Sequence, residues 1–420
     1  MTHVLDDLQW RGLIALSTDL EALRAELSRG PITYYCGFDP TAPSLHVGNL
    51  VQILTVRRLQ LAGHRPLALV GGATGLIGDP RETAERQLHG RDVVAEWVER
   101  VRAQIEPYLD FTGEFAATMV NNLDWTAPLS AIDFLRDVGK HFRVNRMIAK
   151  DVVSTRLRSE EGISYTEFSY QILQGMDYLE LFRRYGCRLQ TGGSDQWGNL
   201  TSGSELIRKV TGESVHLIAT PLITDSQGRK LGKSTGGGGM WLDPQTTSPY
   251  AFYQFFVNAE DEQVPNLLRT FTFLTRAQID EVVAAHDAEP FRRIGQKRIA
   301  LEVTSLVHGT DAAAAAIAAS DALFGQGDLA VLDAETLASA LRELPHSDLP
   351  SGTSVVRALV DTGLVASLGE ARRAIAQGGV SVDGVKVDDE AAVVGGSLPG
   401  GVSVLRRGKK TLAGVFVIRP

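Results

Sequence analysis

The sequence predicts a doubly wound, parallel-sheet α/β domain of the Rossmann-like type, followed by an α-helical domain and a small α+β domain. Two short apolar runs, at 32–38 and 66–70, have the length and composition of buried strands. Between them, residues 45–61 carry apolar side chains at helical spacing, and a glycine and a proline follow where the helix should end. A strand, a helix and a strand within about 40 residues form a unit whose two strands run parallel.

Periodic patterns further along the chain predict the remaining elements. Apolar residues recur at helical spacing at 91–109, 132–138 and 166–185, and the pattern is helical throughout from 249 to about 323. The tail predicts one short helix and three short strands, which are 368–377, 380–382, 385–387 and 415–418.

Changes in composition divide the chain into five segments. At 420 residues it is too long for one ordinary core. The segments are a doubly wound domain at 1–220, a Gly-rich loop and connection at 221–247, a helical domain at 248–325, a linker at 326–352 and a C-terminal domain at 353–420.

Charge and composition exclude several classes of protein. No stretch approaches 18 consecutive apolar residues, so no membrane span is expected, and the N-terminus lacks the pattern of a secretory signal. The two cysteines, Cys36 and Cys187, have no metal-ligand spacing and fit a reducing, cytoplasmic compartment. The net charge is −8, yet residues 351–420 hold nine basic against six acidic side chains. A basic tail on an acidic body indicates an RNA partner at the C-terminal end.

The strongest chemical signal lies at 35–50, where the chain leaves a strand and enters a helix. A helix N-terminus at the carboxyl edge of a parallel sheet attracts phosphate through its free N–H groups and its dipole. Thr41 and His46 could add side-chain donors there, and Gly48 permits close approach of a nucleotide. The plainer alternative is an ordinary strand–helix turn with Ser44 as the cap and a surface histidine.

A second signal is the pentapeptide Lys230-Leu231-Gly232-Lys233-Ser234. Two lysines on a Gly-flanked loop can close over a triphosphate and neutralise the departing pyrophosphate. The alternative is a solvated basic turn.

Three glycines follow the second predicted strand, at 72, 75 and 78, and suggest a dinucleotide-binding dehydrogenase as a rival. Their spacing is Gly-x-x-Gly-x-x-Gly, not Gly-x-Gly-x-x-Gly, and no acidic residue follows a second strand at the expected distance. We therefore reject the dehydrogenase.

Two further segments carry polar side chains suited to a small substrate. In the helix predicted at 166–185, Tyr170, Gln174 and Asp177 lie on one face, and their apolar neighbours favour a buried setting over a solvated one. Residues 190–199 combine a glycine pair with Asp195 and Gln196 at a strand–helix turn.

These motifs together resemble the class I aminoacyl-tRNA synthetases, and within them the bacterial tyrosyl enzymes. His46-Val47-Gly48-Asn49 is similar to the first signature of the class, His-Ile-Gly-His, with asparagine in place of the second histidine. The pentapeptide at 230–234 is similar to the second signature, Lys-Met-Ser-Lys-Ser. The resemblance covers nearly the whole chain and implies activation of L-tyrosine by ATP with Mg²⁺, followed by transfer to tRNA(Tyr).

The resemblance also implies the role of each matching residue. Catalysis would use Thr41, His46, Arg86, Lys230, Lys233 and Ser234. Tyrosine would be held by Tyr35, Asp79, Tyr170, Gln174, Asp177 and Gln196, of which Tyr35 and Asp177 bind the phenolic hydroxyl. ATP would contact Cys36, Gly37, Asp39, His46, Gly48, Asn49, Gly193, Asp195, Leu231 and Lys233.

The resemblance has one local departure. Residues 81–86 are one residue shorter than the basic loop of the family, and Arg81 is the only counterpart of its lysine.

The C-terminal domain is similar to a small RNA-binding fold shared with a ribosomal small-subunit protein. Its basic residues, Arg372, Arg373, Arg406, Arg407, Lys409 and Lys410, suit phosphate contacts to folded RNA. The family implies a homodimer, and we expect no membrane partner and no protein-bound metal.

Two alternatives keep the same fold. A tryptophanyl enzyme would not need hydroxyl readers such as Tyr35 and Asp177. An RNA-binding protein without activity would not need the intact histidine and lysine signatures.

Overall fold

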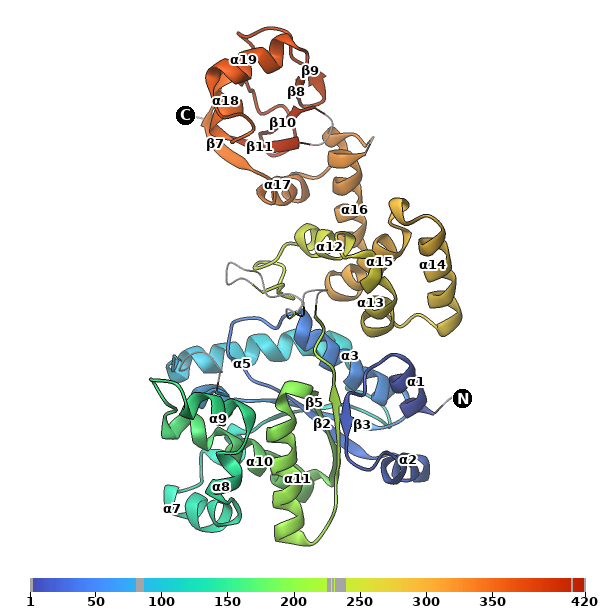
Figure 1. Cartoon of the computed structure of the whole chain (residues 1–420), viewed down its shortest axis with the longest axis vertical. Helices are drawn as coiled ribbons and strands as arrows, with labels where there is room; N and C mark the ends of the chain where they lie inside the picture. Colours follow the sequence, from blue (N-terminus) through green and yellow to red (C-terminus); the bar gives the residue numbers. More distant parts are fainter. Residues whose placement is uncertain are drawn as a thin grey trace. The chain divides into compact units, whose positions relative to one another are not determined.

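The computed structural model describes residues 3–80, 87–224, 228, 230, 239–325, 327–408 and 411–418. The chain forms two compact units (Figure 1). The first unit contains residues 1–243 and 269–273, and the second contains 244–268 and 274–420.

A six-stranded sheet, counted over the described residues, forms the centre of the first unit. Its order is β1-β6-β5-β2-β3-β4, and all neighbours pair in parallel except β1, which is antiparallel to β6. The predicted parallel α/β fold is therefore confirmed. The strands are β1 Leu16–Ser17, β2 Thr33–Phe38, β3 Arg65–Val70, β4 Thr118–Asn121, β5 Cys187–Gly193 and β6 His216–Thr220.

Helices cover both faces of this sheet. Tyr34 and Tyr35 are neighbours in β2 and therefore point to opposite faces. The Tyr34 hydroxyl donates to the carbonyl of Val56 on α3 at 2.6 Å, whereas the Tyr35 ring lies 5.1 Å from the ring of Tyr178 on α10. The main helices are α1 Val4–Trp10, α2 Leu20–Arg29, α3 Val47–Leu61, α5 Arg91–Ile105, α10 Tyr165–Tyr185 and α11 Trp197–Thr211.

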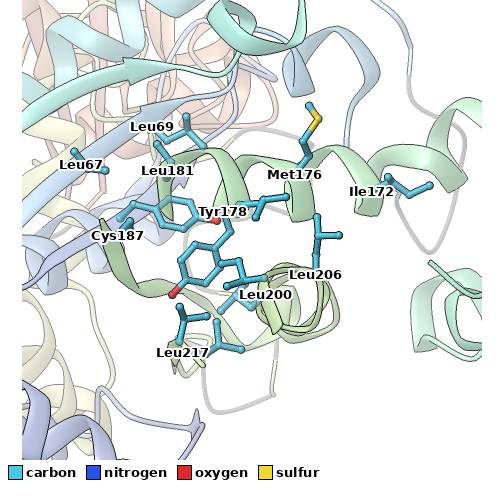
Figure 2. Close-up of a cluster of buried hydrophobic side chains, with 14 of the residues drawn as sticks. Leu67, Leu69, Ile172, Met176, Tyr178, Leu181, Cys187, Leu200, Leu206 and Leu217 are labelled. Atoms are coloured by element: carbon cyan, nitrogen blue, oxygen red, sulfur yellow. The ribbon is translucent and has the colours of Figure 1, made fainter. Parts of the chain in front are cut away.

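The core between the sheet, α10 and α11 is built from alternate strand residues. Figure 2 shows Tyr178 of α10 among Leu200 and Leu206 of α11 and Leu217 of β6. All four side chains are buried, and Tyr178 donates its hydroxyl to the carbonyl of His216 at 3.0 Å. The core therefore fixes α10, the helix that carries the predicted tyrosine-binding residues, against the sheet.

Short helices connect these elements. They are α4 Thr74–Ile77, α6 Leu123–Thr126, α7 Ala131–Asp133, α8 Val144–Met147 and α9 Asp151–Leu157. The helix predicted at 132–138 is α7 followed by a π-helical turn at Phe134–Val138.

The second unit begins with helices and ends with a second sheet. Its helices are α12 Pro249–Val257, α13 Val264–Phe271 (whose last three residues belong to the first unit), α14 Arg276–Ala288, α15 Ile294–His308, α16 Thr310–Phe324, α17 Ala334–Arg342, α18 Val355–Asp361 and α19 Leu368–Ala376. The sheet, with five strands in the described residues, has the order β7-β11-β10-β8-β9. These strands are β7 His346–Pro350, β8 Val380–Val382, β9 Val385–Lys386, β10 Val402–Arg407 and β11 Thr411–Ile418.

The interval predicted as a linker, 326–352, contains α17 and the strand β7. β7 pairs in parallel with β11 and lies at the edge of the sheet. An edge strand tolerates proline because one side of its backbone needs no ladder partner. Pro350 and the polar residues of β7 therefore conceal the strand in the sequence.

Candidate active site

The strand order places the candidate site at the junction of β2 and β5. The chain after β2 passes through α3 to β3 on one side, and the chain after β5 passes through α11 to β6 on the other side. In an open parallel sheet, ligands bind beyond the carboxyl ends of the strands at such a reversal. Asp39 follows the end of β2, and Gly193 ends β5.

The first signature forms the N-terminus of α3. His46 is its N-cap: the Gly48 N–H donates to His46 Nδ1 at 3.0 Å, and the His46 N–H donates to Asn49 Oδ1 at 3.0 Å. Because Nδ1 accepts a hydrogen bond, the neutral ring carries its proton on Nε2. A Cβ atom at position 48 would lie 2.8 Å from His46 Cε1, so glycine is needed beside the imidazole. The cap is therefore His46 and not Ser44, and asparagine replaces the second histidine as the partner in the capping box.

Thr41 and the nearby backbone complete this end of β2. Thr41 is half-buried, and its N–H donates to the carbonyl of Asp39 at 2.9 Å. Cys36 is buried within the strand, and burial raises the pKa of its thiol to about 12. At position 37 an added Cβ would have Leu69 Cδ2, at 3.7 Å, as its nearest neighbour among the described residues.

Asp177 of α10 is held by two side chains that the sequence analysis missed. Its carboxylate accepts from Asn122 Nδ2 at 2.9 Å and from Trp125 Nε1 at 2.8 Å. The side chain is 1% exposed. Burial raises the pKa of Asp177 to about 7, although the two hydrogen bonds oppose the shift.

Tyr35 completes this end of the site. Its hydroxyl is buried and has no hydrogen-bond partner among the described residues. Burial, and the charge of Asp177 next to it, raise the pKa of Tyr35 well above its ordinary value. A buried, neutral phenol that lacks a hydrogen-bond partner among the described residues is suited to bind a polar group of a ligand.

A chain of hydrogen bonds joins Asp177 to Asp39. Asn122 Nδ2 donates to Thr74 Oγ1 at 3.0 Å, and Thr74 Oγ1 donates to Asp39 Oδ1 at 2.6 Å. The hydroxyl of Tyr170 donates to the other oxygen of Asp39 at 2.6 Å. The predicted tyrosine-binding and ATP-binding sets therefore share one network.

A glycine makes room for this network. A Cβ atom at position 71 would lie 2.0 Å from Asp39 Oδ1 and 2.2 Å from Thr74 Oγ1. Any side chain at Gly71 would therefore break the bond between Thr74 and Asp39.

Asp79 forms a second polar group with residues that follow β5. Its carboxylate accepts from Gln196 Nε2 at 2.9 Å and from Asn199 Nδ2 at 3.0 Å. On α10, the Oε1 atom of Gln174 is buried without a hydrogen-bond partner among the described residues. The structure thus brings Asp79 and Gln196 together and leaves an unmet acceptor at Gln174.

Lys150 is another residue that the sequence analysis missed. Its ammonium group donates to the carbonyl of Gly198 and to Ser202 Oγ. Burial lowers its pKa to about 8, although the charges of Glu205 and Asp79 oppose the shift. It lies in no recognisable motif, and its partners are about 50 residues away in the sequence.

The second signature is only partly described. Lys230 Nζ lies 2.9 Å from Asp195 Oδ2 in an exposed ion pair. A Cβ atom at position 193 would lie 2.6 Å from Asp195 Oδ1, so Gly193 allows this aspartate its position. Leu231, Lys233 and Ser234, and also Arg86 of the shortened loop, lie outside the described residues.

Four of the six predicted RNA-binding residues are described, and they divide into two pairs. Arg372 and Arg373 are exposed, and Arg372 makes an exposed ion pair with Glu390 at 3.2 Å. Arg406 and Arg407 are half-buried and held by their own chain. Arg406 donates to the carbonyl of Leu323 at 2.8 Å, and Arg407 donates to the carbonyl of Leu364 at 2.8 Å and pairs with Glu370. Lys409 and Lys410 lie outside the described residues.

Metal-binding clusters and membrane-crossing helices are both absent from the described residues. No group of three or more histidine, cysteine, aspartate or glutamate side chains there is arranged to hold a metal ion. No helix in that part of the chain is long and apolar enough to cross a membrane.

Two family models match the sequence. The family of class I tRNA synthetases for tryptophan and tyrosine matches residues 27–325. The C-terminal domain of tyrosine–tRNA ligases matches residues 336–415. Together the two models span most of the chain.

Curated relatives match along the whole length. The tyrosine–tRNA ligase of Leifsonia xyli subsp. xyli is 64% identical over 417 residues, which cover 99% of this chain and 94% of the relative. The tyrosine–tRNA ligase of Streptomyces avermitilis is 61% identical over 420 residues, 99% of each chain.

Solved structures match about three quarters of the chain. A C-terminally truncated mitochondrial tyrosyl-tRNA synthetase of Coccidioides posadasii is 29% identical with a TM-score of 0.67, covering 75% of this chain and 91% of that one. A tryptophanyl-tRNA synthetase of Encephalitozoon cuniculi is 12% identical with a TM-score of 0.54 over 73% of this chain and 86% of that one, and it shares the fold.

Proposed function

Because the chain belongs to the class I tRNA synthetases for tryptophan and tyrosine, and within them to the tyrosine–tRNA ligases, we propose that the residues at the carboxyl ends of β2 and β5 bind tyrosine and ATP. The enzyme activates tyrosine with ATP and joins it to tRNA.

The geometry around Asp177 carries the proposal. Its carboxylate is buried, and Asn122 and Trp125 hold both oxygens in place. The nearby Tyr35 hydroxyl is buried and has no hydrogen-bond partner among the described residues. A phenolic hydroxyl can donate to Asp177 and accept from Tyr35, whereas phenylalanine would leave both groups unpaired. Tyrosyl enzymes are themselves the standard example of this kind of discrimination, at ~10⁵-fold against phenylalanine.

The opposite end of the substrate needs partners for an ammonium and a carboxylate. Asp79 supplies a negative charge for the ammonium group, and Tyr170 and Gln174 on α10 supply oxygen atoms on the same side. Gln196, which donates to Asp79 at 2.9 Å, would turn an N–H toward the substrate carboxylate. The tyrosine would thus lie along the face of α10 that carries three of its six proposed binding residues.

ATP would bind where α3 begins. The Nε2–H of His46 would be a donor for the phosphates, together with Thr41 after β2, and the positive end of the α3 dipole would favour their charge. Asp39, Gly193 and Asp195 would hold the ribose side. Lys230, Lys233, Ser234 and Arg86 would meet the β- and γ-phosphates, and Mg²⁺ would arrive as the ATP complex.

The reaction has two steps and no covalent enzyme intermediate. The tyrosine carboxylate attacks the α-phosphorus of ATP in line, and the bond to pyrophosphate breaks to give tyrosyl-adenylate. A terminal ribose hydroxyl of the tRNA then attacks the tyrosyl carbonyl, and AMP leaves. Position and charge stabilisation supply most of the catalysis in such transfers.

The second unit would bind the tRNA through its C-terminal domain. Arg372 and Arg373 are exposed and can reach phosphates without losing a buried contact. Arg406 and Arg407 already hold carbonyl groups of their own chain, so we assign them a smaller share of the contact.

A second copy of the chain would cover an apolar surface on the first unit. Five aliphatic side chains between β4 and α10 are 40–70% exposed, namely Ile132, Leu135, Val144, Ile148 and Leu157. Exposed aliphatic side chains within one segment of the chain are suited to a protein–protein contact. A homodimer is therefore proposed, and Val144→Glu with Ile132→Glu should convert it to a monomer in sedimentation velocity runs.

The reaction is assigned to the cytoplasm. Cys36 and Cys187 are buried free thiols, as expected in a reducing compartment.

The deciding experiment is exchange of labelled pyrophosphate into ATP with tyrosine, phenylalanine or tryptophan. We expect exchange with tyrosine alone. Asp177→Asn should lower it about 10- to 100-fold, the scale of one hydrogen bond to a charged group. Asp124→Asn, an exposed aspartate beside Trp125, is the matched control. Exchange with tryptophan would indicate the sister specificity, and exchange with none of them would indicate an RNA-binding protein without activity.

A further inference from the structure

A five-residue segment far along the sequence belongs to the first unit. Residues 269–273 pack with this unit, whereas the residues before and after them belong to the second. The segment contains the end of α13 and the two residues that follow it. The chain therefore passes from one unit to the other at both ends of this segment, as it also does between 243 and 244.

Two arginines of the first unit hold the backbone of this segment. Arg58, near the end of α3, donates through Nη2 to the carbonyls of Thr272 at 2.7 Å, Thr270 at 3.1 Å and Arg269 at 3.4 Å. Arg11, which follows α1, donates through Nη1 to the carbonyls of Arg269 at 2.9 Å and Thr272 at 3.1 Å. We call Arg11 and Arg58 the clamp.

The chemistry of a helix end explains these contacts. The last carbonyls of a helix have no partner within it and carry the negative end of its dipole. Guanidinium groups supply several donors in one plane and the matching charge. The clamp therefore caps α13 from outside the helix.

The contact is costly, which indicates a role beyond packing. Arg58 is 5% exposed, its Nε and Nη1 have no hydrogen-bond partner among the described residues, and its ring contact is Phe273 at 4.9 Å. Burial, and the like charge of Arg11, lower the pKa of Arg58 to about 9, while Asp7 opposes the shift. An apolar side chain would avoid this penalty. The arginine gives directed bonds to the segment, which an apolar side chain cannot give.

The helix that carries Arg58 also begins at His46. Arg58 lies twelve positions after this N-cap, which is about 18 Å along a helix. α3 packs against β2, β3 and β5 and is buried along most of its length. The packed helix α3 therefore links the 269–273 segment to the site at its N-terminus.

We propose that Arg11 and Arg58 are positioning residues for tRNA charging, because they fix the 269–273 segment to the helix that begins at His46. This inference rests on the proposed function, in which the tRNA is bound by the second unit while its 3′ end reacts at the first. Adenylate formation needs only the first unit and does not depend on the clamp. Transfer to tRNA needs both units and does depend on it.

The test compares both steps in the full chain. Arg58→Met keeps the length of the side chain and removes its donors, and Arg57→Met is the matched control. Arg57 is half-buried on the same helix and contacts Gln60 instead of the segment. We expect Arg58→Met to lower kcat/KM for tRNA charging about tenfold, with tyrosine-dependent pyrophosphate exchange within about twofold of the unchanged protein. Arg58→Lys, which keeps one donor, should recover part of the loss, and Arg57→Met should change neither step.

The outcomes separate the clamp from the proposed function. Absence of tyrosine-dependent exchange in the unchanged protein would refute the function itself. If the unchanged protein shows pyrophosphate exchange, equal losses in both steps, or no loss in tRNA charging, would refute the proposed role of the clamp. Should Arg58→Met not fold, Arg11→Met decides, together with hydrogen exchange of the peptide that covers 269–275. Faster hydrogen exchange in that peptide, together with a loss in tRNA charging alone, supports the clamp. Unchanged hydrogen exchange refutes it.

Discussion

At the scale of single residues, the charge of Asp177 should control tyrosine affinity. Its pKa is raised to about 7, chiefly by burial, so at pH 6 the carboxyl is mostly protonated and at pH 8 mostly ionised. The ionised form is the better acceptor for a phenolic hydroxyl, and its fraction rises about tenfold over this range. We expect the Kd for tyrosine to fall by a similar factor from pH 6 to pH 8. Equilibrium titration of tyrosine at several pH values measures this, and a flat profile would contradict it.

The donor Trp125 should set the position of that pH profile. Its indole N–H donates to Asp177 at 2.8 Å and thereby favours the ionised carboxylate. Trp125→Phe removes the donor, so the pKa of Asp177 should rise further and the midpoint of tyrosine binding should move up by about one pH unit. Trp97→Phe, whose ring instead packs on His89 at 4.7 Å, is the control and should leave the midpoint in place.

At the scale of elements, the first signature serves two purposes that a pair of substitutions can separate. His46 caps α3 through Nδ1, and its Nε2–H is the donor proposed for the phosphates. His46→Asn keeps a capping side chain, and His46→Ala removes it, so only the alanine variant should lose about 1 kcal/mol of stability. Both should lower pyrophosphate exchange roughly hundredfold, as loss of one transition-state donor does. Denaturant titration and exchange kinetics measure the two effects, and full exchange activity in His46→Asn would reduce His46 to a cap.

Elements that are local in sequence could be predicted, and contacts between distant elements could not. The unit β2–α3–β3 and the polar face of α10 follow from spacing within a few turns or one strand. Asn122 and Trp125 follow β4, and they reach Asp177 only because β4 pairs beside β3. Their separation from Asp177, 55 and 52 residues, carries no periodic signal. The capping role of His46 was likewise hidden, because histidine is not among the residues preferred at an N-cap.

At the scale of the whole molecule, the sign of the charge differs along the chain: the protein as a whole is acidic, and its C-terminal end is basic. The net charge of −8 is unfavourable for binding RNA by attraction at long range, whereas the basic excess from residue 351 onward is favourable at one end. Half of the predicted basic residues that the structure describes, Arg406 and Arg407, are already used within the fold. The RNA contact therefore depends on few side chains, and each should contribute measurably to the affinity for RNA.

The contribution of Arg372 and Arg373 to RNA binding should be visible in the salt dependence of the affinity. Removing one phosphate contact lowers the slope of log affinity against log salt by about 0.7 to 0.9. Arg372→Ala with Arg373→Ala should therefore weaken tRNA binding and flatten the slope by roughly 1.5, without changing pyrophosphate exchange. Arg357→Ala removes an exposed arginine paired with Asp361 in the same domain and serves as the control. Arg406→Ala should instead lower the melting temperature, because its guanidinium holds the carbonyl of Leu323 at 2.8 Å. If the double variant kept the full slope while Arg357→Ala lost part of it, the RNA-binding face would lie on α18 and not on α19.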